Sequence, residues 1–216
     1  MQCALNIPRI SHWLELSLPR KDQKAYDSTL CNYTGTHVDA PYHFFADGKK
    51  IDEIPLSVFI GQGLVINLAT KGGREIITWD DLAPYSSKMH EGVIVLLLTG
   101  WSAHWNTPRY NDHPFISREA AEGIMSCGVC VVGIDTLSVD ETIVDGTATN
   151  DASFAAHEVI LGSGGIIAEN LTNLEAIVGQ DAVVSLVPLN IQGCDGSPVR
   201  AYARSAVGGF QHNLIS

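Results

Sequence analysis

The chain contains four near-continuous apolar runs of strand length, at residues 63–68, 93–98, 129–134 and 183–189. Runs of this kind, unlike alternating ones, are typical of strands that are covered on both faces. The longest run, from Gly92 to Leu98, is bounded by Glu91 and Thr99 and is far too short to span a bilayer. The pattern therefore predicts a buried sheet and no membrane partner.

Helix signals separate the predicted strands. Thr78 is followed three residues later by Asp81, which is a capping pattern, and a second helical segment begins at Ser117. A third helix is predicted from residues 149–151 to Gly162, which places His157 in its middle. Strands that alternate with helices predict the α/β class. At 216 residues the chain suits one compact core, so we expect a single domain over residues 1–216.

Composition and charge narrow the class of function. Hydrophobic residues make up 45% of the chain and charged residues 17%, the profile of a folded globular protein. The formal net charge is -11, and the 13 Lys and Arg residues form no basic run, which argues against a nucleic-acid partner. A small-molecule substrate is the expected partner. No signal peptide is evident at the N-terminus, so a cytoplasmic location is expected by default.

The five Cys residues are an odd and scattered set, which does not indicate a disulfide framework. Cys127 and Cys130 form a CxxC pattern that leads into a predicted strand. Because no second CxxC accompanies this pair, we interpret both as structural, reduced thiols rather than a metal or redox site.

The segment from Gly35 to His43 concentrates residues that can bind a divalent metal ion. In an extended chain every second side chain lies on the same face, so Tyr33, Gly35, His37 and Asp39 would form one wall. Imidazole nitrogen and carboxylate oxygen together suit zinc, manganese or iron(II). Two His and one Asp within seven residues, interrupted by Pro, are difficult to explain by packing.

Pro41 is expected to turn the chain and bring His43 to the same cavity. The proline restricts Ala40 to an extended conformation before the turn. A histidine beside a metal-activated water can accept its proton at neutral pH and later donate one to the leaving group. Alone, His43 is equally compatible with a hydrogen-bonded core histidine. Together with His37 and Asp39 it favours a metal-dependent hydrolase.

With these motifs the chain resembles the cyclase family of metal-dependent hydrolases, which includes bacterial kynurenine formamidase and isatin hydrolase. Residues 35–44 are similar to the family signature HxGTHxDxPxHF, residues 133–140 to its GIDTxSxD segment, and residues 188–200 to its closing segment. The resemblance covers almost the whole chain. It implies a swivelling β/β/α fold and hydrolysis of an N-formyl amide, cyclic amide or lactone of a small, aromatic substrate by metal-activated water.

The resemblance also implies roles for individual residues. Transferred position by position, it makes His43 the catalytic acid and base, and it gives one or two ions, zinc or manganese, four ligands: His37, Asp39, His157 and Glu169. Related proteins are usually dimers or larger, which implies a homo-oligomer, a dimer or a tetramer.

The sequence departs from the family pattern in two places. Tyr33 stands where the family usually has a further His ligand, so it must ionise at the metal, hydrogen-bond to its water or replace the histidine functionally. We therefore include Tyr33 among the catalytic candidates. The family loop with a substrate-stacking Trp is not recognisable before His37. Trp101 and Trp105 are the candidates for substrate binding, with packing as the alternative for both.

Two other functions remain open. The fold is also compatible with a small-molecule binding protein that has lost its metal through Tyr33. It is likewise compatible with a cyclase or isomerase in which Tyr33 and His43 act as acid and base. Asp135 and Asp140 are expected to organise a turn rather than to bind metal.

Overall fold

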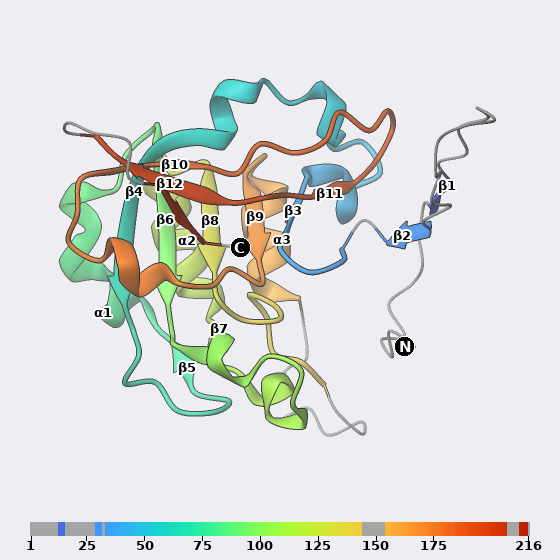
Figure 1. The fold of residues 1–216 in the computed structure, drawn as a ribbon. Helices are drawn as coiled ribbons and strands as arrows, with labels where there is room; N and C mark the ends of the chain where they lie inside the picture. The colour runs from blue at the N-terminus through green and yellow to red at the C-terminus, as the bar shows by residue number, and fades with distance from the viewer. Residues whose placement is uncertain (1–12, 16–28, 32, 144–153, 207–211, 216) are drawn as a thin grey trace.

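The structure is a computed structural model that describes residues 13–15, 29–31, 33–143, 154–206 and 212–215. A nine-stranded sheet runs through it, in the order β11-β3-β9-β8-β6-β4-β10-β12-β13 (Figure 1). Its strands are β3 (His37–Asp39), β4 (Ile60–Asn67), β6 (Val93–Leu98), β8 (Val131–Ile134), β9 (Ile166–Glu169), β10 (Ala182–Ser185), β11 (Gly196–Pro198), β12 (Tyr202–Ser205) and β13 (His212–Leu214). Two short pairs accompany it: β1 (Trp13–Glu15) with β2 (Thr29–Cys31), and β5 (Ile76–Ile77) with β7 (Phe115–Ile116).

The centre of the sheet is parallel and its two sides are antiparallel. Strands β4, β6, β8 and β9 pair in parallel, whereas β3 and β11 on one side and β10, β12 and β13 on the other pair antiparallel. Alternate residues of β6 enter two different hydrophobic clusters, Val95 on one face and Leu96 on the other. Both faces are therefore covered, which explains why the apolar runs are continuous rather than alternating.

The helices are short and lie at the face of the sheet that carries Val95. They are α1 (Trp79–Leu82), α2 (Arg118–Ser126) and α3 (Ala155–Gly162), and Figure 1 shows α2 and α3 behind the sheet. Short 3₁₀ helices occupy many connections: η1 (Pro41–His43), η2 (Ile51–Glu53), η3 (Leu56–Phe59), η4 (Ala83–Lys88), η5 (Trp101–His104), η6 (Pro108–Asp112) and η7 (Leu174–Ile177). The mixed α/β class predicted from the sequence is confirmed.

Local side chains fix where α1 and α2 begin. The carboxylate of Asp81 accepts hydrogen bonds from the backbone N–H and the hydroxyl of Thr78, each at 2.8 Å. The hydroxyl of Ser117 accepts from the N–H of Ala120 at 3.1 Å. These contacts satisfy N–H and hydroxyl groups that the first helical turn leaves unpaired. Both helices therefore begin where the sequence predicted.

The start of α3 differs from the sequence prediction. The predicted first residues, 149–151, lie outside the described residues, and the helix as described begins at Ala155. His157 is therefore in its first turn, not in its middle. The cap comes from a distant residue, because the carboxylate of Asp140 accepts from the N–H groups of Ala156 and His157 at 2.7 and 3.0 Å. The predicted end at Gly162 is confirmed.

The strand predictions agree with the sheet to within a few residues. The run at 93–98 coincides with β6, and the other three runs overlap β4, β8 and β10. The last run is longer than its strand, since β10 ends at Ser185. Pro188, further along the same run, lacks the N–H that a continuing ladder needs.

The described residues bear on two further predictions, one about the cysteines and one about membrane-spanning helices. Among the described side chains, Cys127, Cys130 and Cys194 are free thiols. Within the described ranges, none of the helices combines the length and the apolar character that crossing a bilayer requires.

Candidate metal centre

Strands β3 and β9 bring three of the candidate ligands together. In their antiparallel ladder His37 is directly opposite Glu169, and Asp39 lies two residues further along β3, so all three side chains share one face. The Nε2 atom of His37 lies 3.4 Å from Oε2 of Glu169 and 3.6 Å from Oδ1 of Asp39.

The prediction that residues 33–39 form one extended segment is wrong for its first half. Residues 33–36 form a turn, and Gly35 has a φ of +67°, in the left-handed region that glycine adopts without strain. Only β3 itself is extended. The turn nevertheless places the Tyr33 ring against the edge of His37, with ring centroids 5.6 Å apart.

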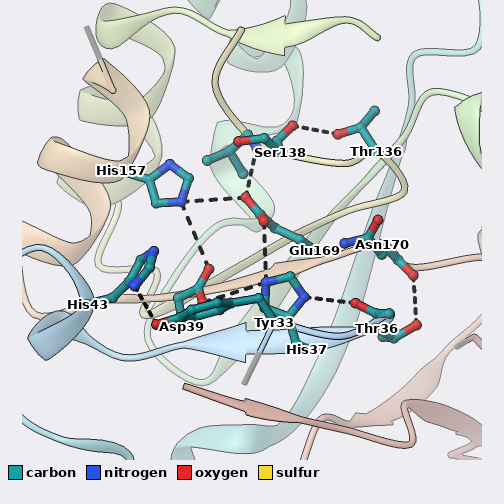
Figure 2. A network of polar contacts seen from close by, with 12 residues as sticks. Tyr33, Thr36, His37, Asp39, His43, Thr136, Ser138, His157, Glu169 and Asn170 are labelled. Carbon is teal, nitrogen blue, oxygen red and sulfur yellow. Dashed lines mark hydrogen bonds and ion pairs between the residues drawn. The ribbon is translucent and has the colours of Figure 1, made fainter. Parts of the chain in front are cut away.

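Helix α3 supplies the fourth candidate ligand, His157. Its Nε2 atom lies 3.5 Å from Oε1 of Glu169 and 3.9 Å from Oδ2 of Asp39. Each carboxylate thus directs one oxygen to His37 and the other to His157, as Figure 2 shows. All four side chains belong to residues that are no more than 5% exposed.

Hydrogen bonds orient both imidazoles. The Nδ1 atom of His37 lies 2.8 Å from the carbonyl oxygen of Gly35, and Nδ1 of His157 lies 2.6 Å from Oδ2 of Asp140. Carbonyl and carboxylate oxygens only accept hydrogen bonds, so Nδ1 of each ring carries the proton. In the neutral imidazole this leaves the lone pair of Nε2 directed at the carboxylates, the arrangement that metal-binding histidines require.

The buried charges of His37, Asp39 and Glu169 shift one another's pKa values. Burial works to lower the pKa of His37, but the carboxylates of Asp39 and Glu169 outweigh burial and raise the pKa to about 9. The pKa of Glu169, which burial works to raise, falls to about 2 because both imidazoles stabilise its charge. Burial raises the pKa of Asp39. Two buried carboxylates therefore require positive charge, from protons on the histidines or from a cation.

The residues fit a divalent metal ion. Within the part of the chain that the structure describes, Oδ1 of Asp39 is buried without a hydrogen-bond partner, a state that is unfavourable for a carboxylate oxygen. Metal bonds of about 2.0–2.2 Å in a tetrahedron place ligand atoms roughly 3.4 Å apart. The nitrogen–oxygen spacings of 3.4 to 3.9 Å are close to this value.

Two overlapping groups of potential ligands share Asp39. The first contains His37, Asp39 and Glu169, the second contains Asp39, His43 and His157, and within each group the ligand atoms lie within 4.8 Å of one another. Asp39 therefore belongs to both groups and would be available to each ion if two were bound. Mixed imidazole and carboxylate donors suit zinc or manganese.

His43 reaches the site through the turn that follows β3. Ala40 is extended, with φ -91° and ψ 161°, as Pro41 predicts, and η1 then carries His43 back towards Asp39 and His157. Its Nδ1 atom lies 2.8 Å from the hydroxyl of Tyr33.

The structure also places Asp195 in the site, a residue that the sequence analysis did not identify. Asp195 accepts a hydrogen bond from the Tyr33 hydroxyl, and its Oδ2 lies 3.3 Å from Nδ1 of His43. The sequence separations are 162 and 152 residues. The one available signal was its position directly before Gly196, in the closing segment that resembles the family.

Asp140 has a larger role than the predicted turn. Besides capping α3 it orients His157, and the adjacent N–H of Val139 donates to Oε1 of Glu169 at 3.0 Å. Asp135, by contrast, fits the predicted role, because it accepts from the N–H and hydroxyl of Thr99 at 2.8 and 2.6 Å.

The two predicted substrate-binding tryptophans have different surroundings. Trp101 is 4% exposed and its indole N–H donates to the carbonyl oxygen of Arg109 at 3.3 Å, so it packs in the core. Trp105 is 55% exposed, and its ring lies 5.2 Å from that of Tyr110. The hydroxyl of Tyr110 donates to Asn170, which follows the candidate ligand Glu169. Contacts thus lead from Trp105 through Tyr110 to the residue after Glu169, whereas Trp101 is not brought to the candidate ligands by these contacts.

Comparison with known sequences points to one family. The pattern of the family described as "Putative cyclase" matches residues 7–141. A kynurenine formamidase from Bacillus cytotoxicus is 34% identical over 177 residues, which cover 82% of this chain and 78% of that protein. A kynurenine formamidase from Bacillus mycoides is 33% identical over 181 residues, with the same coverage of both chains.

Solved structures give the same fold. Isatin hydrolase A from Labrenzia aggregata, bound to benzyl benzoate, has a TM-score of 0.72 and 26% identity and covers 89% of this chain and 82% of its own. Isatin hydrolase A from Ralstonia solanacearum has a TM-score of 0.76, with 94% and 85% coverage, and at 22% identity this likeness concerns the fold alone. The predicted cyclase-like fold is therefore confirmed.

Proposed function

Because this chain belongs to the cyclase family of metal-dependent hydrolases, we propose that it cleaves an N-formyl or cyclic amide, or a lactone, of a small aromatic substrate. The relatives named kynurenine formamidase and the structural neighbours named isatin hydrolase support an aromatic amide. One observation carries the proposal for this chain's own residues. Two buried imidazoles and two buried carboxylates converge, and Oδ1 of Asp39 has no hydrogen-bond partner among the described residues.

The proposed ligands of one or two divalent ions, zinc or manganese, are His37, Asp39, His157 and Glu169. When bound, such an ion polarises the substrate carbonyl and makes water acidic enough to attack at neutral pH. The chain's own residues supply the geometry: Gly35 and Asp140 hold the two imidazoles by Nδ1 and direct Nε2 inward. Asp39 belongs to both ligand groups and would be shared by two ions.

His43 is the proposed proton carrier. The Tyr33 hydroxyl contacts its Nδ1 atom, and Figure 2 shows the second ring nitrogen on the side of His157. From that side His43 accepts the proton of the attacking water and returns it to the leaving nitrogen or oxygen. Of the two tryptophans, Trp105 is the one proposed to contact an aromatic substrate, because its ring is exposed whereas that of Trp101 is buried.

The alternative functions are not favoured. A binding protein that has lost its metal through Tyr33 would need a defective ligand set, yet four other candidate ligands converge without Tyr33. The relatives compared above are named kynurenine formamidase and isatin hydrolase, which favours hydrolysis over cyclisation or isomerisation. We also propose that the protein is cytoplasmic and forms a homo-oligomer. Light scattering on the purified protein measures the oligomeric state.

Metal content and hydrolysis measured on the same preparation test the proposed function. We expect one or two equivalents of zinc or manganese per chain, and hydrolysis of the N-formyl amide of kynurenine or of isatin that stops on chelation and returns with the metal. Asp39→Asn keeps the side-chain size and should lower both metal content and kcat, the latter by about 100-fold or more. Asp181→Asn is the matched control, since Asp181 is exposed and contacts Gln62. Unchanged hydrolysis by metal-free protein would contradict the proposal.

A further inference from the structure

Tyr33, His43 and Asp195 form a hydrogen-bonded cluster beside the four candidate metal ligands. We propose that Asp195 is a positioning residue that holds the His43 imidazole for proton transfer, acting through the Tyr33 hydroxyl between them. This role rests on the proposed function, in which His43 carries the proton. It also gives Tyr33 a place in the site that is not that of a metal ligand.

The direction of each hydrogen bond follows from the chemistry of the three groups. An ionised carboxylate only accepts, so the Tyr33 hydroxyl donates its hydrogen to Asp195. The oxygen of that hydroxyl can then accept from Nδ1–H of His43, 2.8 Å away. The hydrogen-bond chain therefore fixes the neutral tautomer of His43 that carries the proton on Nδ1. Its Nε2 atom keeps the lone pair that accepts a proton from water.

Asp195 also contacts the His43 ring directly. Its Oδ2 lies 3.3 Å from Nδ1, and the carboxylate is 1% exposed while the imidazole is 14% exposed. At this distance and this degree of burial the carboxylate can also accept from Nδ1–H of His43 directly. Asp195 thus holds the imidazole both directly and through the Tyr33 hydroxyl.

The backbone holds Asp195 rigidly against β3. Its carbonyl oxygen accepts from the N–H of Ala40 at 2.8 Å, and the next residue, Gly196, pairs with Asp39. A Cβ atom on Gly196 would lie 2.7 Å from the carbonyl oxygen of Val38 and 3.2 Å from Cε1 of Tyr33. Only glycine allows this close approach. The sequence Asp195-Gly196 therefore places a carboxylate at the Tyr33 hydroxyl with little freedom to move.

The hydrogen bonds of this cluster differ from the contacts that join the four candidate ligands. The Tyr33 hydroxyl contacts Asp195 and His43, whereas the contacts among His37, Asp39, His157 and Glu169 are made without it. Removing the hydroxyl or the Asp195 charge should therefore change proton transfer and leave metal binding intact. If either residue had a purely structural role or were a metal ligand, its removal should instead lower the metal content.

Asp195→Asn, Tyr33→Phe and the double variant, each prepared as the zinc-loaded protein, test this role. We expect kcat to fall about 10- to 100-fold in each single variant, with KM and zinc content within twofold of the wild type. The double variant should be no slower than Asp195→Asn, because that substitution already removes the carboxylate on which both contacts with His43 depend. Asp181→Asn serves again as the control. Losses that multiply, an unchanged kcat, or a fall in zinc content would overturn the role of Asp195.

Nitrogen-15 NMR of the His43 ring gives a readout that does not depend on hydrolysis. In the zinc-loaded wild type we expect the tautomer with the proton on Nδ1, and in Asp195→Asn a mixture of both tautomers. In Tyr33→Phe, where Asp195 still faces Nδ1 at 3.3 Å, we expect a smaller shift towards the same mixture. An unaltered tautomer in both variants would overturn the inference even if the enzyme is active. A wild type that binds no metal and cleaves no substrate would instead overturn the proposed function, so the two failures are distinguishable.

Discussion

Oδ2 of Asp140 lies 2.6 Å from Nδ1 of His157, and the same carboxylate accepts the backbone N–H groups of Ala156 and His157. One side chain therefore caps the first turn of α3 and fixes the imidazole that this turn carries. Asp140 is only 3% exposed, so water does not readily replace these contacts. The geometry of one candidate ligand is thereby tied to the position at which its helix begins.

Asp140→Asn should weaken metal binding. An amide keeps the size of the side chain but loses the charge that holds Nδ1–H of His157, and the loss of such an outer partner typically lowers metal affinity about 10- to 100-fold. Competition with a chromophoric chelator measures the effect. Glu158→Gln is the control on the same helix, because Glu158 is exposed and pairs with Arg118 on the surface. Equal affinities in the two variants would contradict the positioning role of Asp140.

The metal-free protein should lose stability as the pH rises from about 6.5 to about 9. Burial works to lower the pKa of His37, but Asp39 and Glu169 raise it from 6.5 to about 9 in the folded state. In that window the folded state holds a proton that the unfolded state has released, so its stability falls with rising pH, by about 3 kcal/mol in total. The raised pKa of His157 acts in the same direction. Urea unfolding of chelator-treated protein measures the change.

The metal-loaded protein is the control for this pH dependence. Glu169 does not interfere, because its pKa is lowered from 4.5 to about 2 and its stabilisation is lost only at acid pH. With the metal bound, Nε2 of His37 is occupied and no longer takes up the proton, so the decline between pH 6.5 and 9 should disappear. A flat profile in the metal-free protein would show that the carboxylates do not hold the extra proton on His37.

The sequence predicted those residues of the site that lie close together along the chain. His37 and Asp39 share a face because β3 is extended, and Pro41 turns the chain so that His43 returns to them. Asp195 could not be predicted in this way. Its contact with Tyr33 joins positions 162 residues apart and depends on β11 lying beside β3, an order that apolar periodicity does not specify.

The boundaries that the sequence misplaced have a related cause. Helix α3 begins where Asp140, 17 residues before His157, satisfies its first N–H groups, so no local cap residue signals the start. Residues 33–36, which were predicted to be extended, form a turn because Gly35 permits a positive φ. His157 and Glu169 lie on separate elements, and only the family resemblance predicted that they would meet.

Gly196→Ala should destabilise the protein and loosen the site together. The added methyl group would lie 2.7 Å from the carbonyl oxygen of Val38 and 3.2 Å from Oδ1 of Asp39, so β11 must move away from β3. Overpacking of this kind typically costs about 1–3 kcal/mol, and urea unfolding measures it. Gly72→Ala is the control, because a Cβ there meets only Oε2 of Glu75 at 3.6 Å. Equal stability of the two variants would mean that the β3–β11 contact is not tight.

Tyr33→His should raise metal affinity and lower kcat at the same time. The substitution offers a neutral imidazole, a better metal ligand than a phenol, at an aromatic position whose centroid lies 5.6 Å from that of His37. It also removes the hydroxyl that links Asp195 to His43, so proton transfer should suffer although the metal is held about tenfold more tightly. Tyr33→Phe removes the hydroxyl without adding a ligand and should leave the affinity unchanged, as isothermal titration with zinc can measure. If the histidine variant binds zinc no more tightly than the phenylalanine variant, residue 33 does not reach the metal position, and its whole contribution to the site passes through Asp195 and His43.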